Sequence, residues 1–375
     1  MPTKPFIPHE LPLTNLDWKT LTPLIAKANA ELARYDGLLQ TMLNPEILLS
    51  PLTTSEAVLS SMIEGTQATL GEVLQYEAGA QFGKEKTHDI HEIRNYREAL
   101  RAAEGALLNG RTISLNLIKS LHQLLMQGVR GQNKSPGEFR NTQNWIGSKS
   151  GQMEEAAFVP PDPLLMPEYL EKWERYAAQD DGDILTQLAI IHAQFEIIHP
   201  FKDGNGRMGR ILIPLFLYQR KALHRPMFYL SEFLERHRDE YCNRLGNISK
   251  YNDWQNWILF FLNGVREQAE INFEKTKTIA TLYNNMKREI LSITKSQFSL
   301  PVLDTLFVCP IISVTEFMNR TGIKNRTTAN TILNQLERAK ILELWKEGAG
   351  RSPSIYAFPK ILTIAEGREL LTEIH

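Results

Sequence analysis

Cysteine is scarce in this chain, with only Cys242 and Cys309 among 375 residues. Two cysteines far apart in sequence argue against a disulfide framework and against a zinc site built from cysteine clusters, and they favour a reducing compartment. The first six residues have no apolar core of the kind found in a signal peptide. The longest apolar runs, at 211–218 and 257–262, are too short to span a bilayer. We therefore expect a cytoplasmic protein that does not insert into a membrane.

An excess of either charge is also missing. The chain has 42 Lys and Arg against 43 Asp and Glu, which gives a net charge of −1. This balance implies no general attraction to nucleic acid or to an anionic membrane, so any basic face has to be local. What is present is the composition of an ordinary globular protein, 42% hydrophobic and 23% charged, with a length that suggests two or three domains.

Apolar residues recur at helical spacing through most of the chain, which predicts a mainly α protein. We expect helices over 55–63, 89–108, 114–129, 166–178 and 183–198, and another that starts near Arg207. Further helices should run to about residue 295, with a break at 251–253. Glycine and serine between short apolar pieces predict a β-hairpin over 144–159, which Pro160-Pro161 ends.

The pattern of predicted elements changes at Leu300, from long helices to short helices and strands. We expect helices over 312–321 and 326–340, then strands over 341–345 and 355–358 on either side of a glycine-rich tip that carries Arg351. That order suits a winged helix-turn-helix. The predicted domains are a helical region at 1–108, a core at 109–270, a linker helix at 271–299 and the winged helix at 300–375.

Residues 199–210 read His-Pro-Phe-Lys-Asp-Gly-Asn-Gly-Arg-Met-Gly-Arg and concentrate unusual chemistry in one short stretch. His199 follows a predicted helix that Pro200 stops, and its ordinary pKa of about 6.5 suits a general base. Asp203 offers one oxygen ligand to a Mg²⁺ ion that already carries phosphate oxygens and water.

The second half of this stretch suits phosphate. Gly204 and Gly206 let backbone amides approach a ligand closely, and the next helix begins just after them. A helix start attracts phosphate through its amide donors and its dipole, and Arg207 and Arg210 add guanidinium groups that match phosphate oxygens. These groups together predict nucleotidyl or phosphoryl transfer.

The stretch resembles the signature of Fic-family enzymes, and the resemblance extends over about 60–262. It implies a Fic-type helical core that moves AMP from ATP to a protein hydroxyl on Ser, Thr or Tyr, in target proteins or in the enzyme itself, with ATP and Mg²⁺ as cofactors. The unaltered Gly-Asn-Gly-Arg cradle favours AMP over the phosphate or phosphocholine that some relatives transfer. The implied roles are general base for His199, metal ligand for Asp203, anion cradle for Gly204, Asn205 and Gly206, phosphate clamp for Arg207, and γ-phosphate contact for Arg210.

Two more elements resemble parts of Fic proteins. The predicted hairpin, at about 140–160, resembles the flap that holds a target protein by strand addition. Residues Ser60, Glu64 and Gly65, in a predicted helix at about 55–65, resemble the family's inhibitory motif. The resemblance implies that Glu64 pairs with Arg210 and so removes the cation meant for the γ-phosphate. It further allows Glu64 to position water for the reverse reaction, removal of AMP.

Aromatic residues near the adenine pocket of family members suggest a nucleotide-binding role for Tyr241, although Cys242 replaces the second aromatic of the usual pair. Helix packing is the alternative role for Tyr241. His192 lies on roughly the same helix face as His199 and is expected to be a packed histidine.

A competing function comes from the C-terminal module. The chain could be a DNA-binding transcriptional regulator whose Fic core senses a nucleotide, or the module could serve protein contacts and a homodimer. Residues 300–375 hold nine Lys and Arg against eight Asp and Glu, a net of +1, which is a weak basic footprint for a DNA binder. The residues of its second helix that could reach bases and phosphates are Arg326, Thr327, Thr328, Asn330, Asn334 and Arg338.

Overall fold

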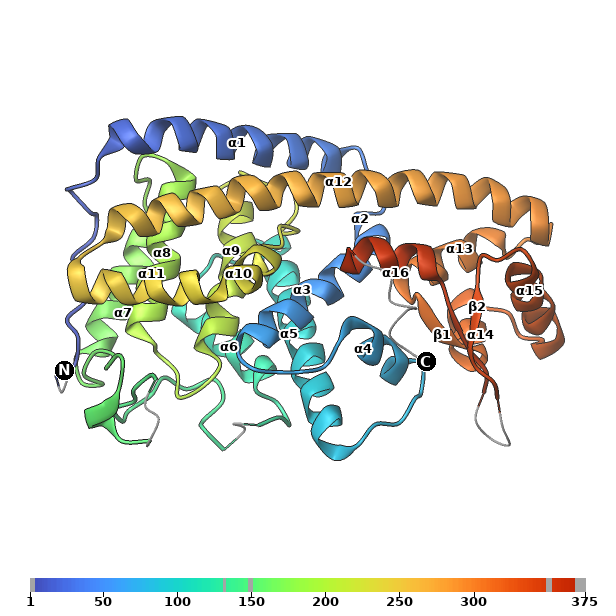
Figure 1. Ribbon diagram of the computed structural model, residues 1–375, viewed down its shortest axis with the longest axis horizontal. Helices are drawn as coiled ribbons and strands as arrows, with labels where there is room; N and C mark the ends of the chain where they lie inside the picture. The colour runs from blue at the N-terminus through green and yellow to red at the C-terminus, as the bar shows by residue number, and fades with distance from the viewer. Residues whose placement is uncertain (1–3, 131–132, 148–150, 349–352, 368–375) are drawn as a thin grey trace. The chain divides into compact units, whose positions relative to one another are not determined.

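The computed structural model describes residues 4–130, 133–147, 151–348 and 353–367, and these form a mainly helical protein, as expected (Figure 1). Among the helices described, none combines the length and apolar character that a bilayer span requires. The elements in chain order are α1 (Trp18–Gln40), α2 (Pro45–Leu48), α3 (Ser50–Ile63), α4 (Leu70–Glu77), α5 (Lys84–Leu108), α6 (Leu115–Leu125), the 3-10 turn η1 (Met153–Glu155), α7 (Met166–Ala178), α8 (Ile184–Ile198), α9 (Asn205–Gln219), α10 (Ser231–Arg236), α11 (Arg238–Tyr251), α12 (Trp254–Thr294), α13 (Ser299–Val308), β1 (Ile311–Ser313), α14 (Val314–Thr321), α15 (Arg326–Arg338), β2 (Glu343–Lys346), β3 (Ile355–Ala357) and α16 (Pro359–Glu366).

The chain divides into two compact units that are discontinuous in sequence. Unit 1 comprises Met1–Gly37, Leu59–Gly65 and Arg94–Glu270, and unit 2 comprises Leu38–Val58, Thr66–Ile93 and Ile271–His375. The last segment of unit 1 ends at Glu270, and the predicted domain boundaries stay predictions. The predicted linker helix over 271–299 is the second part of α12 followed by the start of α13.

Helix α8 is the centre of unit 1. Thirteen of its fifteen residues are buried, which explains why its sequence is apolar on every side instead of showing one apolar stripe. Helices α7, α9 and α11 pack against it, and α6 packs against α9 (Figure 1). The side chain of Asp183 caps the helix start by accepting a hydrogen bond from the Thr186 amide. Because α8 is buried along nearly its whole length, its end has a fixed position, and His199 follows directly after it.

The predicted start of one helix was wrong. Pro51 was expected to precede a helix over 55–63, but α3 begins at Ser50 and contains Pro51 in its first turn. A proline in the first turn removes only an amide that has no helical partner anyway, so the helix can begin before it. The predicted end at Ile63 is confirmed. Gly65 follows with φ of 97°, a left-handed conformation that favours glycine.

The C-terminal part of unit 2 has the predicted order of helix, helix, strand and strand in α14, α15, β2 and β3. Helices α13 and α16 were not predicted, and neither was β1, because Ile312 and Ser313 were expected to start a helix and instead belong to that strand. The three strands form an antiparallel sheet in the order β1-β3-β2, with Ile312 opposite Tyr356. The glycine-rich tip with Arg351 lies outside the described residues. The winged-helix assignment and DNA binding stay predictions.

The predicted hairpin over 144–159 is smaller than expected. It contains one isolated antiparallel bridge, Ile146 with Phe158, and the turn η1, and residues 148–150 fall outside the described part. Gly147 has φ of 75°, and a Cβ on it would lie 2.8 Å from the Cβ of Ala157. The two arms therefore approach so closely that glycine is required there.

Two glycines in helices of unit 1 predict opposite effects of the same substitution. A Cβ on Gly264 of α12 would lie 2.6 Å from the Phe233 ring, whereas a Cβ on Gly105 of α5 meets nothing within 4 Å. We expect Gly264→Ala to lower the free energy of unfolding by about 1–3 kcal/mol through overpacking. Gly105→Ala should raise it by about 0.5–1 kcal/mol through helix propensity. Chemical denaturation of both variants checks this, and equal effects of the two substitutions would contradict it.

Candidate active site

His199 stands at the end of α8 in a left-handed conformation, with φ of 50° and ψ of 60°. Its amide still donates to the Phe195 carbonyl, and the side-chain Nδ1 lies 3.2 Å from the carbonyl oxygen of Glu196. Because a carbonyl can only accept, Nδ1 carries the ring proton in this contact and Nε2 keeps its lone pair. Burial lowers the pKa of His199 to about 4, so the ring is neutral at pH 7 and can accept a proton.

Arg140 holds this strained helix end. Its Nε donates to the His199 carbonyl at 2.9 Å, and its own amide donates to the Pro200 carbonyl at 2.8 Å. Its Nη2 donates to the carbonyls of Pro161 and Ile198. Burial lowers the pKa of Arg140 to about 10, which still leaves it charged at neutral pH. A buried cation therefore satisfies carbonyls that the end of α8 leaves without helical partners.

Asn205 closes the loop between α8 and α9. Its Oδ1 accepts from the Phe201 amide and its Nδ2 donates to the Phe201 carbonyl, both at 2.8 Å. The side chain that the sequence assigned to the anion cradle is thus turned into the loop. Gly204 is the N-cap of α9 with φ of 76°, and the first amides of α9 have no partner within the helix.

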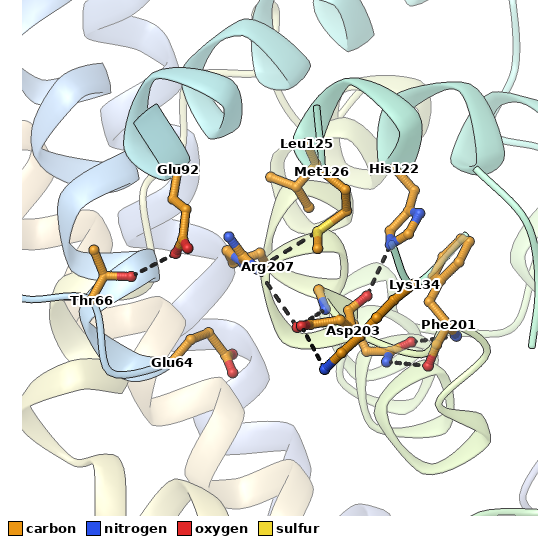
Figure 2. Close-up of polar contacts among 12 residues, drawn as sticks. Glu64, Thr66, Glu92, His122, Leu125, Met126, Lys134, Phe201, Asp203 and Arg207 are labelled. Carbon is orange, nitrogen blue, oxygen red and sulfur yellow. Dashed lines mark hydrogen bonds and ion pairs between the residues drawn. The ribbon is translucent and has the colours of Figure 1, made fainter. Parts of the chain in front are cut away.

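Arg207 and Arg210 project from the first turns of α9, and both are buried. Arg207 Nη2 lies 3.8 Å from Asp203 Oδ1 and 3.7 Å from the sulfur of Met126 (Figure 2). Arg210 contacts the end of α3: its Nε donates to Ser60 Oγ at 2.8 Å and its Nη2 to the Ser60 carbonyl at 2.9 Å. Ser60, Glu64 and the arginines are therefore brought together, although they are far apart in the chain.

Glu64 forms an ion pair with Arg210. Its Oε1 lies 2.7 Å from Arg210 Nη2, and the Arg210 side chain is 1% exposed against 39% for Glu64. Burial opposes ionisation of Glu64, but the charge and hydrogen bond of Arg210 and the charge of Arg207 act together to hold the pKa of the carboxyl below its ordinary value. A Cβ on Gly206 would lie 2.1 Å from the same Oε1. The carboxylate therefore fills the space beside the start of α9, so this space accepts an anion.

The Asp203 carboxylate lies at the edge of this anion site. Lys134 Nζ is 3.4 Å from its Oδ2, and the side chain is 35% exposed (Figure 2). Among the described residues, no group of three or more His, Cys, Asp or Glu could enclose a metal ion. A single accessible carboxylate fits Mg²⁺, since this ion keeps several waters and is completed by phosphate oxygens.

A pocket of about 330 Å³ opens beside His199. Ile146, Ala157 and Phe158 of the predicted flap line it together with Glu196 and the face of α11 that includes Cys242, Asn243 and Asn247. Burial raises the pKa of Glu196 to about 8, so this carboxyl is largely protonated at neutral pH.

Tyr241 packs inward, 4% exposed, with its hydroxyl 2.8 Å from His192 Nε2. His192 is buried as well, and burial lowers its pKa to about 3. This arrangement is the one expected of the packing alternative for Tyr241. His192 is a packed histidine, as expected.

The structure thus gathers a neutral base, two arginines, an anion site and an accessible carboxylate in unit 1. The sequence pattern missed Arg140 and Glu196, because an arginine in a turn and a glutamate on an apolar helix give no periodic signal. It also missed His122 and Lys134, whose positions beside the loop come from tertiary contacts. A base beside an anion site can deprotonate a nucleophile that attacks a bound phosphate.

Two family models match this chain. Residues 22–104 match the Fic/DOC family N-terminal model and residues 112–217 match the Fic/DOC family model, together just over half of the chain. Among solved structures, a Fic family protein from Desulfovibrio desulfuricans is similar with a TM-score of 0.59 at 20% identity, covering 93% of this chain and 98% of its own. A fragment of Fic-1 from Caenorhabditis elegans is similar with a TM-score of 0.53 at 20% identity, covering 71% and 74%. These likenesses show a shared fold.

Curated relatives are also similar in sequence. A probable protein adenylyltransferase of Aquifex aeolicus is 25% identical over 203 residues, which are 53% of this chain and 57% of the relative. The protein adenylyltransferase Fic of Drosophila grimshawi is 28% identical over 159 residues, 41% of this chain and 31% of the relative. The chain therefore spans little more than half of the first relative and about a third of the second. With both family models matched and the Fic fold shared, the chain belongs to the Fic/DOC family.

Proposed function

We propose that this protein is a protein adenylyltransferase that moves AMP from ATP to a side-chain hydroxyl of Ser, Thr or Tyr. The observation that carries the proposal is the neutral, proton-accepting Nε2 of His199 beside an anion site that already holds a carboxylate. The names of the curated relatives support the same activity.

His199 Nε2 takes the proton of the target hydroxyl. The hydroxyl oxygen then forms a bond to the α-phosphorus of ATP, the bond from that phosphorus to the bridging oxygen breaks, and pyrophosphate leaves with the electron pair. The start of α9 and Arg207 bind the phosphate oxygens and stabilise the charge that develops on them. Asp203 would hold Mg²⁺, and the ion would supply positive charge that offsets the charge of the nucleotide phosphates.

The target protein docks against the predicted flap. Trp145 and Ile146 are exposed large apolar residues there, and Ile146 also lines the pocket beside His199. Strand addition uses main-chain hydrogen bonds and so accepts many sequences, which leaves the target undefined by this surface alone.

Glu64 restrains the activity. Arg210 carries one positive charge, and Glu64 already pairs with it through Nη2 while Nε and Nη2 also bind Ser60. A γ-phosphate therefore competes with Glu64 for that charge. An incoming phosphate also meets the Glu64 carboxylate in the space beside Gly206. The resting protein is therefore inhibited, and release requires the end of α3 to move or Glu64 to lose its charge.

Removing the Glu64 carboxylate should activate the protein. We expect Glu64→Gly to raise incorporation of AMP from α-labelled ATP by roughly 5-fold to 150-fold, the usual range for coupling between two binding events. The matched variant Glu64→Gln keeps the length of the side chain but not its charge. Its AMP incorporation should lie between that of the unsubstituted protein and that of Glu64→Gly. Incorporation that stays the same in Glu64→Gly would contradict autoinhibition.

Removing the base should abolish the activity. In the Glu64→Gly background, His199→Ala should lower AMP incorporation by roughly 10²–10⁴-fold, the contribution of a positioned general base. Mass spectrometry of the protein and of added lysate proteins distinguishes AMP from phosphate. A modified mass equal to phosphate alone would refute adenylyl transfer.

The acid limb of the pH profile of kcat/KM should lie at an unusually low pH. Because burial lowers the pKa of His199 to about 4, the neutral base persists well below the ordinary value of 6.5 and is lost only as the pH falls toward 4. The dependence of kcat/KM on pH in Glu64→Gly, measured with saturating Mg²⁺, checks this. An acid limb centred near 6.5 would mean that His199 is solvated in the working enzyme.

A further inference from the structure

His122 of α6 packs against the loop that carries Asp203 and contacts the main-chain carbonyl of that residue. Its Nε2 is 2.9 Å from the Asp203 carbonyl oxygen (Figure 2). The amide of Gly137 lies 2.9 Å from its Nδ1. The ring is 1% exposed and stacks on Phe201, with ring centroids 3.7 Å apart and an angle of 6° between the planes. The mechanism described above makes no use of this residue.

The two partners of His122 fix its tautomer. A backbone amide can only donate, so Nδ1 accepts from Gly137 and has no proton. A carbonyl can only accept, so Nε2 carries the proton and donates it to Asp203. The two requirements agree on one neutral tautomer, and the stacked ring cannot turn to exchange the two nitrogens without losing both bonds.

This contact sets the direction of a whole peptide unit. In a planar trans peptide the carbonyl and the following amide point in opposite directions. When His122 holds the Asp203 carbonyl toward α6, the Gly204 amide must point away from α6. That amide donates to Asp203 Oδ1 at 2.7 Å.

The loop has little room to adjust. A Cβ on Gly204 would lie 2.9 Å from the sulfur of Met126 and 3.4 Å from His122 Nε2, so the loop backbone lies directly on the end of α6. A Cβ on Gly137 would lie 3.2 Å from the Lys119 carbonyl, so the turn before the flap lies against the same helix. Helix α6 thus holds the loop and this turn, and His122 connects them.

We propose that His122 is a positioning residue that holds the Asp203–Gly204 peptide in the orientation in which the Gly204 amide donates to Asp203 Oδ1 and so directs that carboxylate toward the Mg²⁺ of a bound nucleotide. The inference rests on the proposed function, because that Mg²⁺ is the group that the Asp203 carboxylate would bind. It assigns no proton transfer to His122.

Two substitutions separate the hydrogen bonds from the packing. His122→Phe keeps an aromatic ring on Phe201 but removes both hydrogen bonds. His122→Gln offers an amide whose oxygen can accept from Gly137 and whose nitrogen can donate to Asp203. Both are made in the full chain that carries Glu64→Gly, so that the inhibitory carboxylate does not compete, and thermal unfolding reports any general loss of folding.

The measurement is the Mg²⁺ concentration that gives half-maximal binding of ATP, followed by calorimetry and thus independent of turnover. We expect His122→Phe to raise it on the order of 10-fold to 100-fold, as loss of a residue that orients a metal ligand commonly does, and His122→Gln to recover most of the loss. Binding by His122→Phe within about threefold of the parent, or no recovery in His122→Gln, overturns the proposal.

A second measurement does not depend on nucleotide. Nitrogen chemical shifts of the unsubstituted chain labelled with ¹⁵N-histidine, with His122 assigned by its loss in His122→Gln, report which ring nitrogen carries the proton at neutral pH. A protonated Nε2 with an unprotonated Nδ1 supports the proposed positioning role of His122, and the opposite tautomer overturns it. If the Glu64→Gly parent binds no ATP with Mg²⁺, the proposed function fails. The tautomer then still tests whether His122 holds the Asp203 carbonyl.

Discussion

A guanidinium buried in a helical core needs a counter-charge, and the arrangement of this active site follows from where Arg210 finds one. The Arg210 side chain is 1% exposed, so its position on α9 is fixed by packing. The hydroxyl and the carbonyl of Ser60 accept hydrogen bonds from the guanidinium, and Glu64 supplies the counter-charge. Substrate binding and inhibition, as proposed, are then a competition for one cation in one place.

The loop around this cation is held mainly through its backbone. Arg140 binds carbonyls at the end of α8, Asn205 closes the turn on Phe201, and His122 holds the Asp203 carbonyl. Because these contacts use main-chain atoms, none of them occupies the Nε2 of His199 or the carboxylate of Asp203. The left-handed conformation of His199 is unfavourable for a non-glycine residue and persists because the surrounding contacts determine it.

Local signals located most helices. Asp183 before an apolar run and Pro200 after it bounded α8, and the end of α3 near Gly65 was also predicted. The strand β1 was missed because three residues have no measurable period, and only pairing with Ile355–Ala357 makes them a strand. The role of Tyr241 was equally open, since the same ring could face a ligand or pack on His192.

The sequence by itself determined the chemical groups of the site and their order, because a base, a carboxylate, two glycines and two arginines lie within residues 199–210. It also placed Ser60, Glu64 and Gly65 at a helix end, since spacing and a glycine are local properties. The pairing of Glu64 with Arg210 across 146 residues was implied by the family resemblance and not by any local pattern, and only the tertiary structure decided that Arg140 and His122 hold the loop. Such pairs depend on how helices pack, and no local period in the sequence encodes that packing.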